Sequence, residues 1–310
     1  MKLFAYRGRQ PNFGDDLNHW LWGRLLPGFL DDDERELFLG IGSILHSRLD
    51  PAAKKLVFGT GFGGYGAVPR LDRNWHVYFV RGPQTAAALG INRRYGIGDA
   101  AILVRSCWDA AAVPKRHDVS FMPHFESAIH GRWEEVCRRA GVNFIDPRWD
   151  VEVVLGEISA SRLVVSEAMH GVIVADALRI PWRAARPLDP ANRAKWFDWA
   201  DSLGISIDFT DLGPSNAVEA LGRLLAWNRS LHKQVVFRHR RIRQLTRDQV
   251  FGATVDRLRT AAGRGGQLSP DASIESAHAA MLEQLDELRA DYPGRTMARG
   301  PLAEVERSNG

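Results

Sequence analysis

The residue types with the clearest potential for chemistry lie at residues 166–171, which read Ser-Glu-Ala-Met-His-Gly. The apolar run at 163–165 predicts a buried parallel strand, and the apolar residues up to Leu178 predict a helix. In an open α/β sheet, the turn that carries Ser166 and His170 faces the ligand crevice, and Gly171 permits close backbone packing. His170 then lies beside free N–H groups that favour a phosphate or carboxylate, and it can transfer a proton there. The alternative is a His that only caps the helix.

Asn12 and Asp15 lie at a second turn of this kind, between a strand expected at residues 2–6 and a helix expected at 17–25. Because they follow a strand and precede a helix, we expect them at the same ligand-facing edge as His170. A carboxylate in the first turn of a helix is also favoured by the helix dipole. Helix capping by Asp15 is therefore the alternative to a catalytic role.

Arg81 ends a strand expected at residues 76–80, and a helix expected at 83–89 follows, since proline suits the first turn. The planar guanidinium of Arg81 suits bidentate pairing with a phosphate or a carboxylate. The alternative is an ordinary salt bridge at the surface.

Two glycine-rich turns, which include Gly42 and Gly61, follow strands expected at residues 36–41 and 56–58. Residues 59–64 formally match the dinucleotide pattern G-x-G-x-x-G. Chain breakers follow these glycines instead of a helix, and no acidic residue lies about 20 positions later to bind a ribose. We therefore interpret the glycines as places where a loop approaches a ligand or a neighbouring chain closely.

Alternating strands and helices predict an α/β fold with two Rossmann-like domains that face a cleft. The first domain is expected at residues 1–112, with 97–103 as a fifth sheet element, and the second at 117–230, after a linker at 110–116. His124, at the end of a strand expected at 118–122, is a further candidate for the cleft. The other elements expected in the second domain are strands at 142–145 and 181–185, an edge piece at 206–209, and helices at 133–140, 151–160 and 191–203.

A helical extension is expected at residues 231–292, and residues 293–310 are expected to form a disordered tail. The extension contains a basic run at 238–243, which suits an anionic lipid surface or an acidic partner, or is simply solvated. The helices expected in this part of the chain span 216–229, 231–262 and 274–290, with a linker at 263–269.

The composition is that of a globular chain, with 310 residues, 45% of them hydrophobic, and a formal net charge of +4. Two cysteines without metal-ligand spacing favour a reducing compartment and no structural metal. Because neither a signal peptide nor an apolar run of about 18 residues is present, we expect a cytoplasmic protein. No motif argues for nucleic acid. Of the ten tryptophans, most are expected in the core and some on a sugar-stacking surface.

With these pieces assembled, the sequence resembles the polysaccharide pyruvyl transferase family. It looks most like the branch that makes pyruvate ketals on bacterial exopolysaccharides such as succinoglycan. The matching pieces occur in family order across about residues 5–205. They lie at residues 12–18, 40–45, 59–63, 80–85, 98–99 and 166–171.

The resemblance implies a two-domain arrangement similar to that of glycosyltransferases of the B fold, with phosphoenolpyruvate as the donor and no cofactor or metal. The implied product is a pyruvate ketal across two sugar hydroxyls, with phosphate released. His170 matches the essential His of the family, and Arg81 matches an Arg that holds the donor. Lys195 falls near a basic residue beyond the His-Gly helix, although the spacing is longer here. Many members have Arg and Leu where this chain has Ala168 and Met169.

This chemistry needs a proton for the methylene carbon of the donor, and His170 is the candidate acid–base group. Asp15 or Asp99 could accept the proton of an acceptor hydroxyl. The implied acceptor is a lipid-linked oligosaccharide at the inner face of the cytoplasmic membrane, with peripheral contact through the basic helix. The alternatives are a nucleotide-sugar glycosyltransferase of the B fold and a non-catalytic carbohydrate-binding protein.

Overall fold

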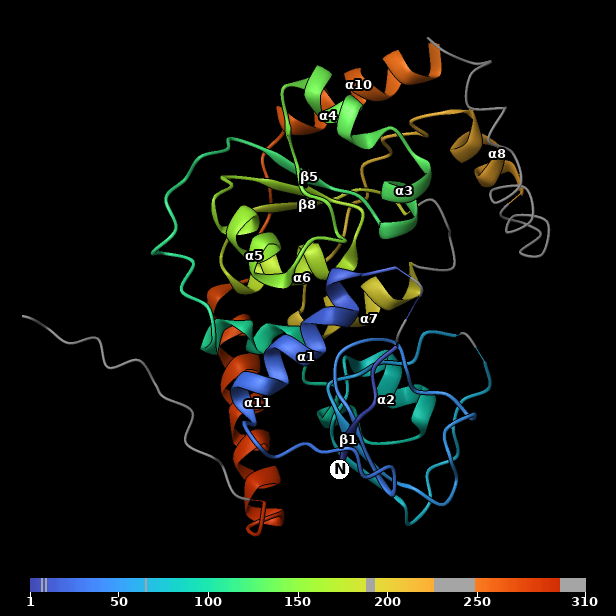
Figure 1. The fold of residues 1–310 in the computed structure, drawn as a ribbon, viewed down its shortest axis with the longest axis vertical. Helices are drawn as coiled ribbons and strands as arrows, with labels where there is room; N and C mark the ends of the chain where they lie inside the picture. The colour runs from blue at the N-terminus through green and yellow to red at the C-terminus, as the bar shows by residue number, and fades with distance from the viewer. Residues whose placement is uncertain (7, 9, 65, 188–192, 226–248, 296–310) are drawn as a thin grey trace, which may run out of the picture.

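Two parallel four-stranded sheets organise the chain, one in the lower and one in the upper half of Figure 1. The structure is a computed structural model, and it describes residues 1–6, 8, 10–64, 66–187, 193–225 and 249–295. Helices pack around and between the sheets. The α/β class and the parallel sheets that the sequence predicts are therefore confirmed.

The first sheet contains β1 (Lys2–Leu3), β2 (Glu36–Leu39), β3 (Lys54–Phe58) and β4 (Trp75–Phe79), which lie side by side in chain order. Every neighbouring pair is parallel. Phe38 and Phe58 face one hydrophobic core, while Leu39 and Val57 face another, as in a parallel sheet that is covered on both sides. The sequential strand order differs from the 3-2-1-4 order of a Rossmann fold.

The second sheet contains β5 (Ser120–Met122), β6 (Asn143–Phe144), β7 (Val164–Ser166) and β8 (Trp182–Ala184). Its strands lie in the order β6-β5-β7-β8 and are all parallel. Numbered within the sheet, this order is 2-1-3-4, which matches the first four strands of a flavodoxin-like doubly wound sheet. The helices of this half are α3 (Phe125–His130), α4 (Trp133–Ala140), α5 (Val151–Ser159), α6 (Met169–Ala177) and α7 (Ala194–Leu203).

One continuous hydrophobic core joins the two halves. The helix α1 (Phe13–Leu25) packs against α5 and α6 of the second half, and Figure 1 shows it lying between the sheets. The 3-10 helix η2 (Ala100–Ser106) also packs against α6. The first half is completed by α2 (Pro83–Leu89) and the short 3-10 helix η1 (Arg93–Tyr95).

The expectation that residues 97–103 form a fifth sheet element is wrong. Asp99 instead starts η2, and its side chain accepts a hydrogen bond from the amide of Ala101. Residues 100–104 are all buried against other helices. A short apolar run that is buried on every side suits a buried helix as well as a strand, so the residue pattern alone did not separate the two. The edge piece expected at 206–209 is irregular, and a parallel bridge forms at Thr210 instead.

The C-terminal helices that were predicted as an extension pack closely against both halves. The helix α10 (Gln249–Ala262) packs against α4, with Val255 and Leu258 in the core of the second half. After an antiparallel bridge between Gln267 and Trp182, the chain returns to the first half. There α11 (Asp271–Asp291) packs against η2 and β4 and fills the shared core with Ile274, Met281, Leu285 and Leu288.

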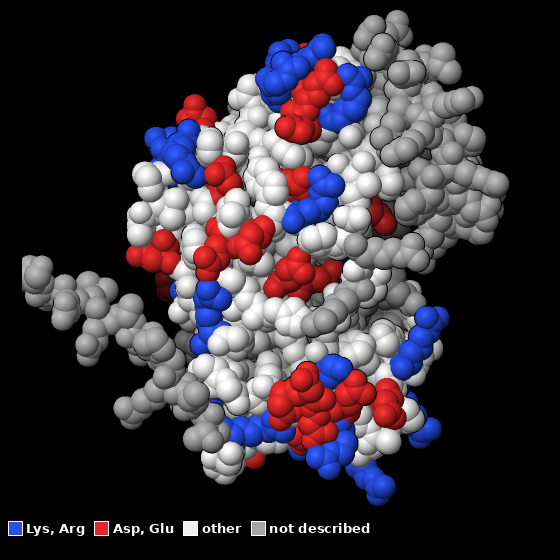
Figure 2. Space-filling model, in the orientation of Figure 1, with Lys and Arg blue, Asp and Glu red and all other residues white. Residues whose placement is uncertain are grey.

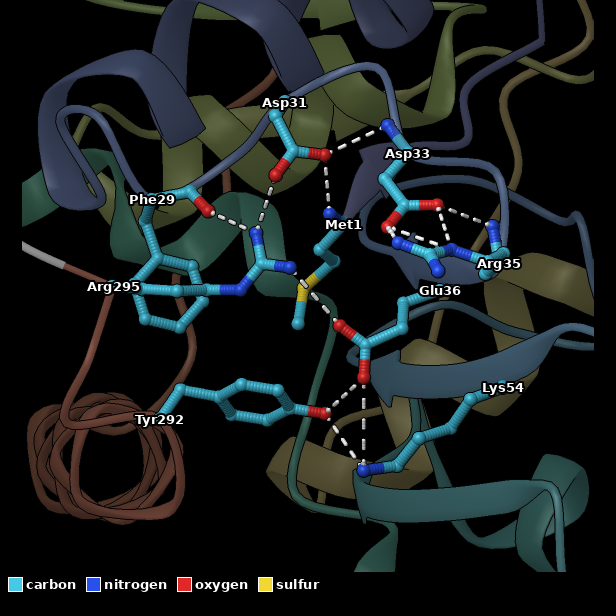
Figure 3. A network of polar contacts seen from close by, with 9 residues as sticks. All are labelled: Met1, Phe29, Asp31, Asp33, Arg35, Glu36, Lys54, Tyr292 and Arg295. Atoms are coloured by element: carbon cyan, nitrogen blue, oxygen red, sulfur yellow. Dashed lines mark hydrogen bonds and ion pairs between the residues drawn. The ribbon is translucent and has the colours of Figure 1, made fainter.

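A polar network fastens the end of α11 to the first sheet (Figure 3). The Tyr292 hydroxyl accepts a hydrogen bond from Nζ of Lys54 at 2.8 Å and donates one to Oε1 of Glu36 at 3.1 Å. Arg295 donates to Oε2 of Glu36 at 3.1 Å and to Oδ2 of Asp31 at 2.9 Å. Arg295 belongs to the tail that was expected to be disordered from residue 293, so the ordered chain extends further than predicted.

Some predictions for the C-terminal part fall partly or wholly outside the described residues. The helix expected at 216–229 corresponds to α8 (Ala217–Leu225), and of the helix expected at 231–262 only α10 is described. The basic run at 238–243 and residues 296–310 lie outside the described residues. Among the helices that are described, none is both long enough and apolar enough to cross a membrane.

Candidate active site

His170 and Asp99 form a close pair of buried polar groups. His170 is the second residue of α6 and follows the turn after β7. Its Nε2 lies 3.7 Å from Oδ2 of Asp99, and the Asp99 side chain is fully buried while that of His170 is 15% exposed. Within the described part of the chain, neither atom has a hydrogen-bond partner. Catalytic hydrogen bonds are often this long before substrate binds, so Asp99 is placed to orient the imidazole.

Gly14 provides the space for the His170 ring. A Cβ atom at residue 14 would lie 2.0 Å from Nδ1 of His170, which no real side chain tolerates. The first turn of α1 therefore packs directly on the imidazole, and the next residue is Asp15.

Asp15 is a carboxyl group with an unusual environment. Burial raises its pKa above the ordinary carboxyl value, although a hydrogen bond from Nδ2 of Asn12 at 2.7 Å and the charges of His170 and Lys195 act in the opposite direction. The capping role that was the alternative for Asp15 falls to Asp16, whose Oδ2 accepts a hydrogen bond from the amide of Asn12 at 3.0 Å. A carboxyl group with a raised pKa beside a His is typical of acid–base sites.

Lys195 lies within electrostatic range of Asp15 and also of His124. Lys195 is in the first turn of α7, and its charge lowers the pKa of both Asp15 and His124. Burial, together with Lys195, lowers the pKa of His124 to about 3, so its imidazole is neutral at physiological pH. The backbone amide of His124 donates to Oε2 of Glu167 at 3.0 Å, which fixes the turn after β5. Lys195 is thus a cation whose charge acts on both Asp15 and His124.

Arg81 lies in the interior and not in the surface salt bridge that was the alternative for it. Its side chain is fully buried, and its Nε donates to Oδ2 of Asp198 at 3.1 Å. Its other nitrogens donate to Oγ of Ser43 at 2.8 Å and to the carbonyl oxygen of Phe62 at 3.0 Å. The guanidinium therefore binds groups of the protein itself and braces the loops that follow β2 and β3.

The two predicted glycines belong to these same loops. A Cβ at Gly61 would lie 2.1 Å from Cζ of Arg81, so glycine is needed for the close approach. The carbonyl oxygen of Gly42 accepts hydrogen bonds from the amide of Gly61 and from Oγ1 of Thr60, both at 2.9 Å. Both glycines thus belong to the packed loops around the Arg81 guanidinium.

Asp198 is an important residue that the sequence analysis missed. It lies on α7 between two buried tryptophans and is itself almost completely buried. Besides binding Arg81, its carboxylate accepts hydrogen bonds from the amides of Gln84 and Thr85 at the start of α2. The only available signal was an acidic residue in an otherwise apolar position of the predicted helix.

Ser166 and Gly171 shape the turn that presents His170. The Ser166 hydroxyl is buried, accepts a hydrogen bond from the amide of Ala168 at 3.0 Å, and lies within hydrogen-bond distance of the carbonyl oxygens of Met122 and Ala168. A Cβ at Gly171 would lie 2.6 Å from this hydroxyl, which agrees with the predicted close packing. Ala168, the N-cap of α6, makes no side-chain hydrogen bond to the helix, so in the described structure no cap side chain satisfies the first amide groups.

Together, these features describe a parallel α/β protein in which His170 lies between Asp99 and the first turn of α1, at the N-terminus of a helix. The family model described as "Polysaccharide pyruvyl transferase" matches residues 23–185, which is more than half of the chain. The chain therefore belongs to the polysaccharide pyruvyl transferase family and is a transferase.

A curated relative agrees with this assignment. The chain is 42% identical over 224 residues to a protein of Rhizobium meliloti (strain 1021) described as "Succinoglycan biosynthesis protein ExoV", and the match covers 71% of each chain. The family resemblance predicted from the ordered motifs, including its succinoglycan-type branch, is therefore confirmed.

Proposed function

We propose that this transferase moves the pyruvyl group of phosphoenolpyruvate onto a hexose of an exopolysaccharide repeat as a ketal and releases phosphate. Family membership and the succinoglycan-biosynthesis relative support the reaction class. Within the structure, the proposal rests on the position of His170, which lies between the Asp99 carboxylate and the first turn of α1 that carries Asp15.

The first step is protonation of the donor. His170 gives a proton to the methylene carbon of phosphoenolpyruvate, which becomes a methyl group and leaves an oxocarbenium-like centre at the adjacent carbon. A sugar hydroxyl adds to this centre, and its proton passes to Asp15 or back to His170. Asp99 stabilises the protonated imidazole and fixes which ring nitrogen faces it.

The second step exchanges phosphate for the other hydroxyl. The bond between the central carbon and the phosphate oxygen breaks, phosphate leaves, and a second oxocarbenium-like centre forms. The second sugar hydroxyl adds there and closes the ketal ring, and its proton passes to the released phosphate, which leaves as hydrogen phosphate. One donor and one sugar diol thus give one ketal and one phosphate, so no redox partner is needed.

The donor carries several negative charges, and Lys195 and the start of α6 are the groups that we assign to them. Amide groups at a helix N-terminus attract phosphate and carboxylate. Because Ala168 leaves these amides without a side-chain cap, an anionic substrate can bind to them. Neutral His124 supplies a hydrogen bond without adding charge. Arg81 supports the site indirectly, because it holds the loops that follow β2 and β3 in place.

The setting of the reaction is also part of the proposal. A lipid-linked acceptor at the cytoplasmic face of the membrane fits an enzyme of exopolysaccharide assembly. Figure 2 shows acidic and basic side chains interspersed on the face it presents, with no extended basic surface among the residues described there.

A two-domain arrangement like that of B-fold glycosyltransferases fits the order of the second sheet better than the order of the first.

The direct test is to incubate the protein with phosphoenolpyruvate and a panel of hexose acceptors and to follow the reaction by ³¹P and ¹H NMR. We expect acceptor-dependent phosphate release together with a new ketal methyl signal. Replacing His170 with Asn is expected to reduce the rate by roughly 10²–10⁴-fold, because a proton donor is lost. Circular dichroism should show that the variant keeps its fold.

A matched control is His76→Asn. The His76 side chain is 46% exposed and lies within the edge strand β4, not in the turns that carry the candidate site residues. This variant should react at the wild-type rate. Phosphate release by the His170 variant at the wild-type rate would contradict the role of His170. If nucleotide sugars but not phosphoenolpyruvate bind by calorimetry, the chain is a glycosyltransferase and the proposed donor is wrong.

A further inference from the structure

A groove of about 500 Å³ lies along the exposed side of α5, and none of the candidate site residues lines it. We define the α5 groove by its lining residues, which are Arg116, His117, Asn143, Trp149, Asp150, Val153 and Glu157. Its volume is within the range of ligand-binding clefts.

The apolar end of the α5 groove carries two unusually exposed side chains. Trp149 is 39% exposed and Val153 is 50% exposed, although most large hydrophobic side chains of the described chain are buried. The Trp149 ring is held edge-on against Phe144, with ring centroids 6.2 Å apart, so it forms a firm platform. An exposed, supported Trp beside polar groups is suited to stack on the apolar face of a sugar ring.

The polar end of the α5 groove is organised around Glu157. Its carboxylate accepts hydrogen bonds from Nδ2 of Asn143 at 2.8 Å and from a guanidinium nitrogen of Arg116 at 2.9 Å. Nε2 of His117 lies 3.0 Å from Oε2 of Glu157. These planar groups can donate to and accept from the hydroxyls of a saccharide.

The charges of the α5 groove select against other ligands. The carboxylates of Glu157 and of Asp150, which also lines the groove, offset Arg116, so a phosphate backbone or an anionic lipid surface would meet repulsion. A neutral polyhydroxylated chain meets no such penalty, and it can satisfy both the apolar and the polar end.

One segment of the chain connects the groove to the helix that carries Asp15. The carbonyl oxygen of Pro147, two residues before Trp149, accepts a hydrogen bond from the amide of Phe13 at 2.7 Å. Phe13 starts α1, and Gly14 and Asp15 follow it. Farther along the two helices, Nε1 of Trp20 donates to Oε1 of Glu152 at 3.1 Å. Residues 147–149 therefore run from the first turn of α1, which carries Asp15, to Trp149 in the groove.

We propose that the α5 groove binds the sugar units of the acceptor chain next to the unit that receives the pyruvyl group, with Trp149 as the stacking platform. This inference rests on the proposed function, because it assumes a saccharide acceptor.

The test compares acceptors of increasing length with phosphoenolpyruvate as the donor. Glucose, cellobiose and cellotetraose are used as probes, together with their galactose-based counterparts. For the wild type, kcat/KM should rise with acceptor length. Trp149→Ala should lower kcat/KM for the four-unit acceptors roughly tenfold, because the stacking contact is lost, and should leave the single-unit sugars unchanged. Trp149→Phe should restore most of the loss.

Two valine variants provide a matched comparison. Val153→Ala removes methyl groups inside the groove, whereas Val68→Ala does so at an exposed position outside it. We expect the first to weaken the preference for long acceptors and the second to have no effect. If wild type and Trp149→Ala depend on acceptor length in the same way, the α5 groove is not an acceptor site, although the proposed reaction still stands.

Calorimetry with the four-unit saccharides keeps the two proposals separable. If no acceptor is turned over but these saccharides bind to the wild type and not to Trp149→Ala, the groove is supported and the proposed reaction fails. If they do not bind to the wild type at all, the groove proposal is overturned.

Discussion

His170 is surrounded by three neighbours that act on it in different ways. Asp99 offers a buried, unpartnered carboxylate oxygen, Gly14 offers space, and Asp15 offers a carboxyl group whose pKa is raised by burial. Holding an ionised carboxylate in a buried position costs stability, and enzymes commonly accept this cost at their active sites. We therefore expect Asp15 to be needed for the reaction while its ionised form lowers the stability of the folded protein.

This leads to a prediction for Asp15→Asn. Because the pKa of Asp15 is raised in the folded state, its favourable contribution is present below the unfolded pKa and is lost as the pH rises through the folded pKa. At pH 7 the carboxylate is therefore destabilising, and the neutral Asn should raise the urea midpoint while activity falls by about 10²-fold or more. At pH 4 the gain in stability should shrink.

Urea unfolding at the two pH values, followed by circular dichroism, measures this difference. The Asn side chain can still accept the hydrogen bond from Asn12, so the local contacts are retained. An equal stability gain at pH 4 and pH 7 would show that ionisation of Asp15 is not the cause.

At the scale of elements, the buried pair of Arg81 and Asp198 connects α7 to β4 and to the start of α2. Replacing Asp198 with Ala leaves the guanidinium buried without its partner, and such a change costs about 3–5 kcal/mol. We expect Asp198→Ala to lower the free energy of unfolding by about this amount in chemical denaturation.

The double variant Arg81→Met with Asp198→Leu is the control for this prediction. Because it removes both charges, it should recover much of the lost stability. If the loss in the double variant equals the sum of the losses in Arg81→Met alone and Asp198→Leu alone, the two side chains do not depend on each other.

The same elements show what the sequence could predict. Residues 163–178 gave β7 and α6 correctly, because long apolar runs that flank a polar turn leave few other structures. His170 and Asp15 were predicted at strand-to-helix turns, and the structure places each of them in the first turn of a helix. The pairing of Arg81 with Asp198 joins residues 117 positions apart in the chain, and no local pattern encodes such a contact.

At the scale of the whole molecule, α11 is the element that closes the shared core. Its buried face includes Leu285, which is 1% exposed. Leu285→Ala removes a buried side chain and leaves a cavity, so we expect it to destabilise the protein by about 2–5 kcal/mol. Glu283→Ala, at an exposed position of the same helix, should change stability by no more than about 0.5 kcal/mol.

Thermal and chemical unfolding of the two variants measure this contrast. A negligible effect of Leu285→Ala would show that α11 is not part of the cooperative core, and that the first half is stable without it.

The return of α11 to the first half also affects how the chain is made. Residues 271–291 are synthesised late, yet they cover η2 and β4, which are synthesised in the first third of the chain. The early sheet therefore leaves the ribosome with an apolar surface that stays uncovered until residues 271–291 have emerged. Contacts so distant in sequence form slowly, and exposed apolar surface promotes aggregation in the meantime. The yield of native protein should thus depend on how the cell protects this surface during translation.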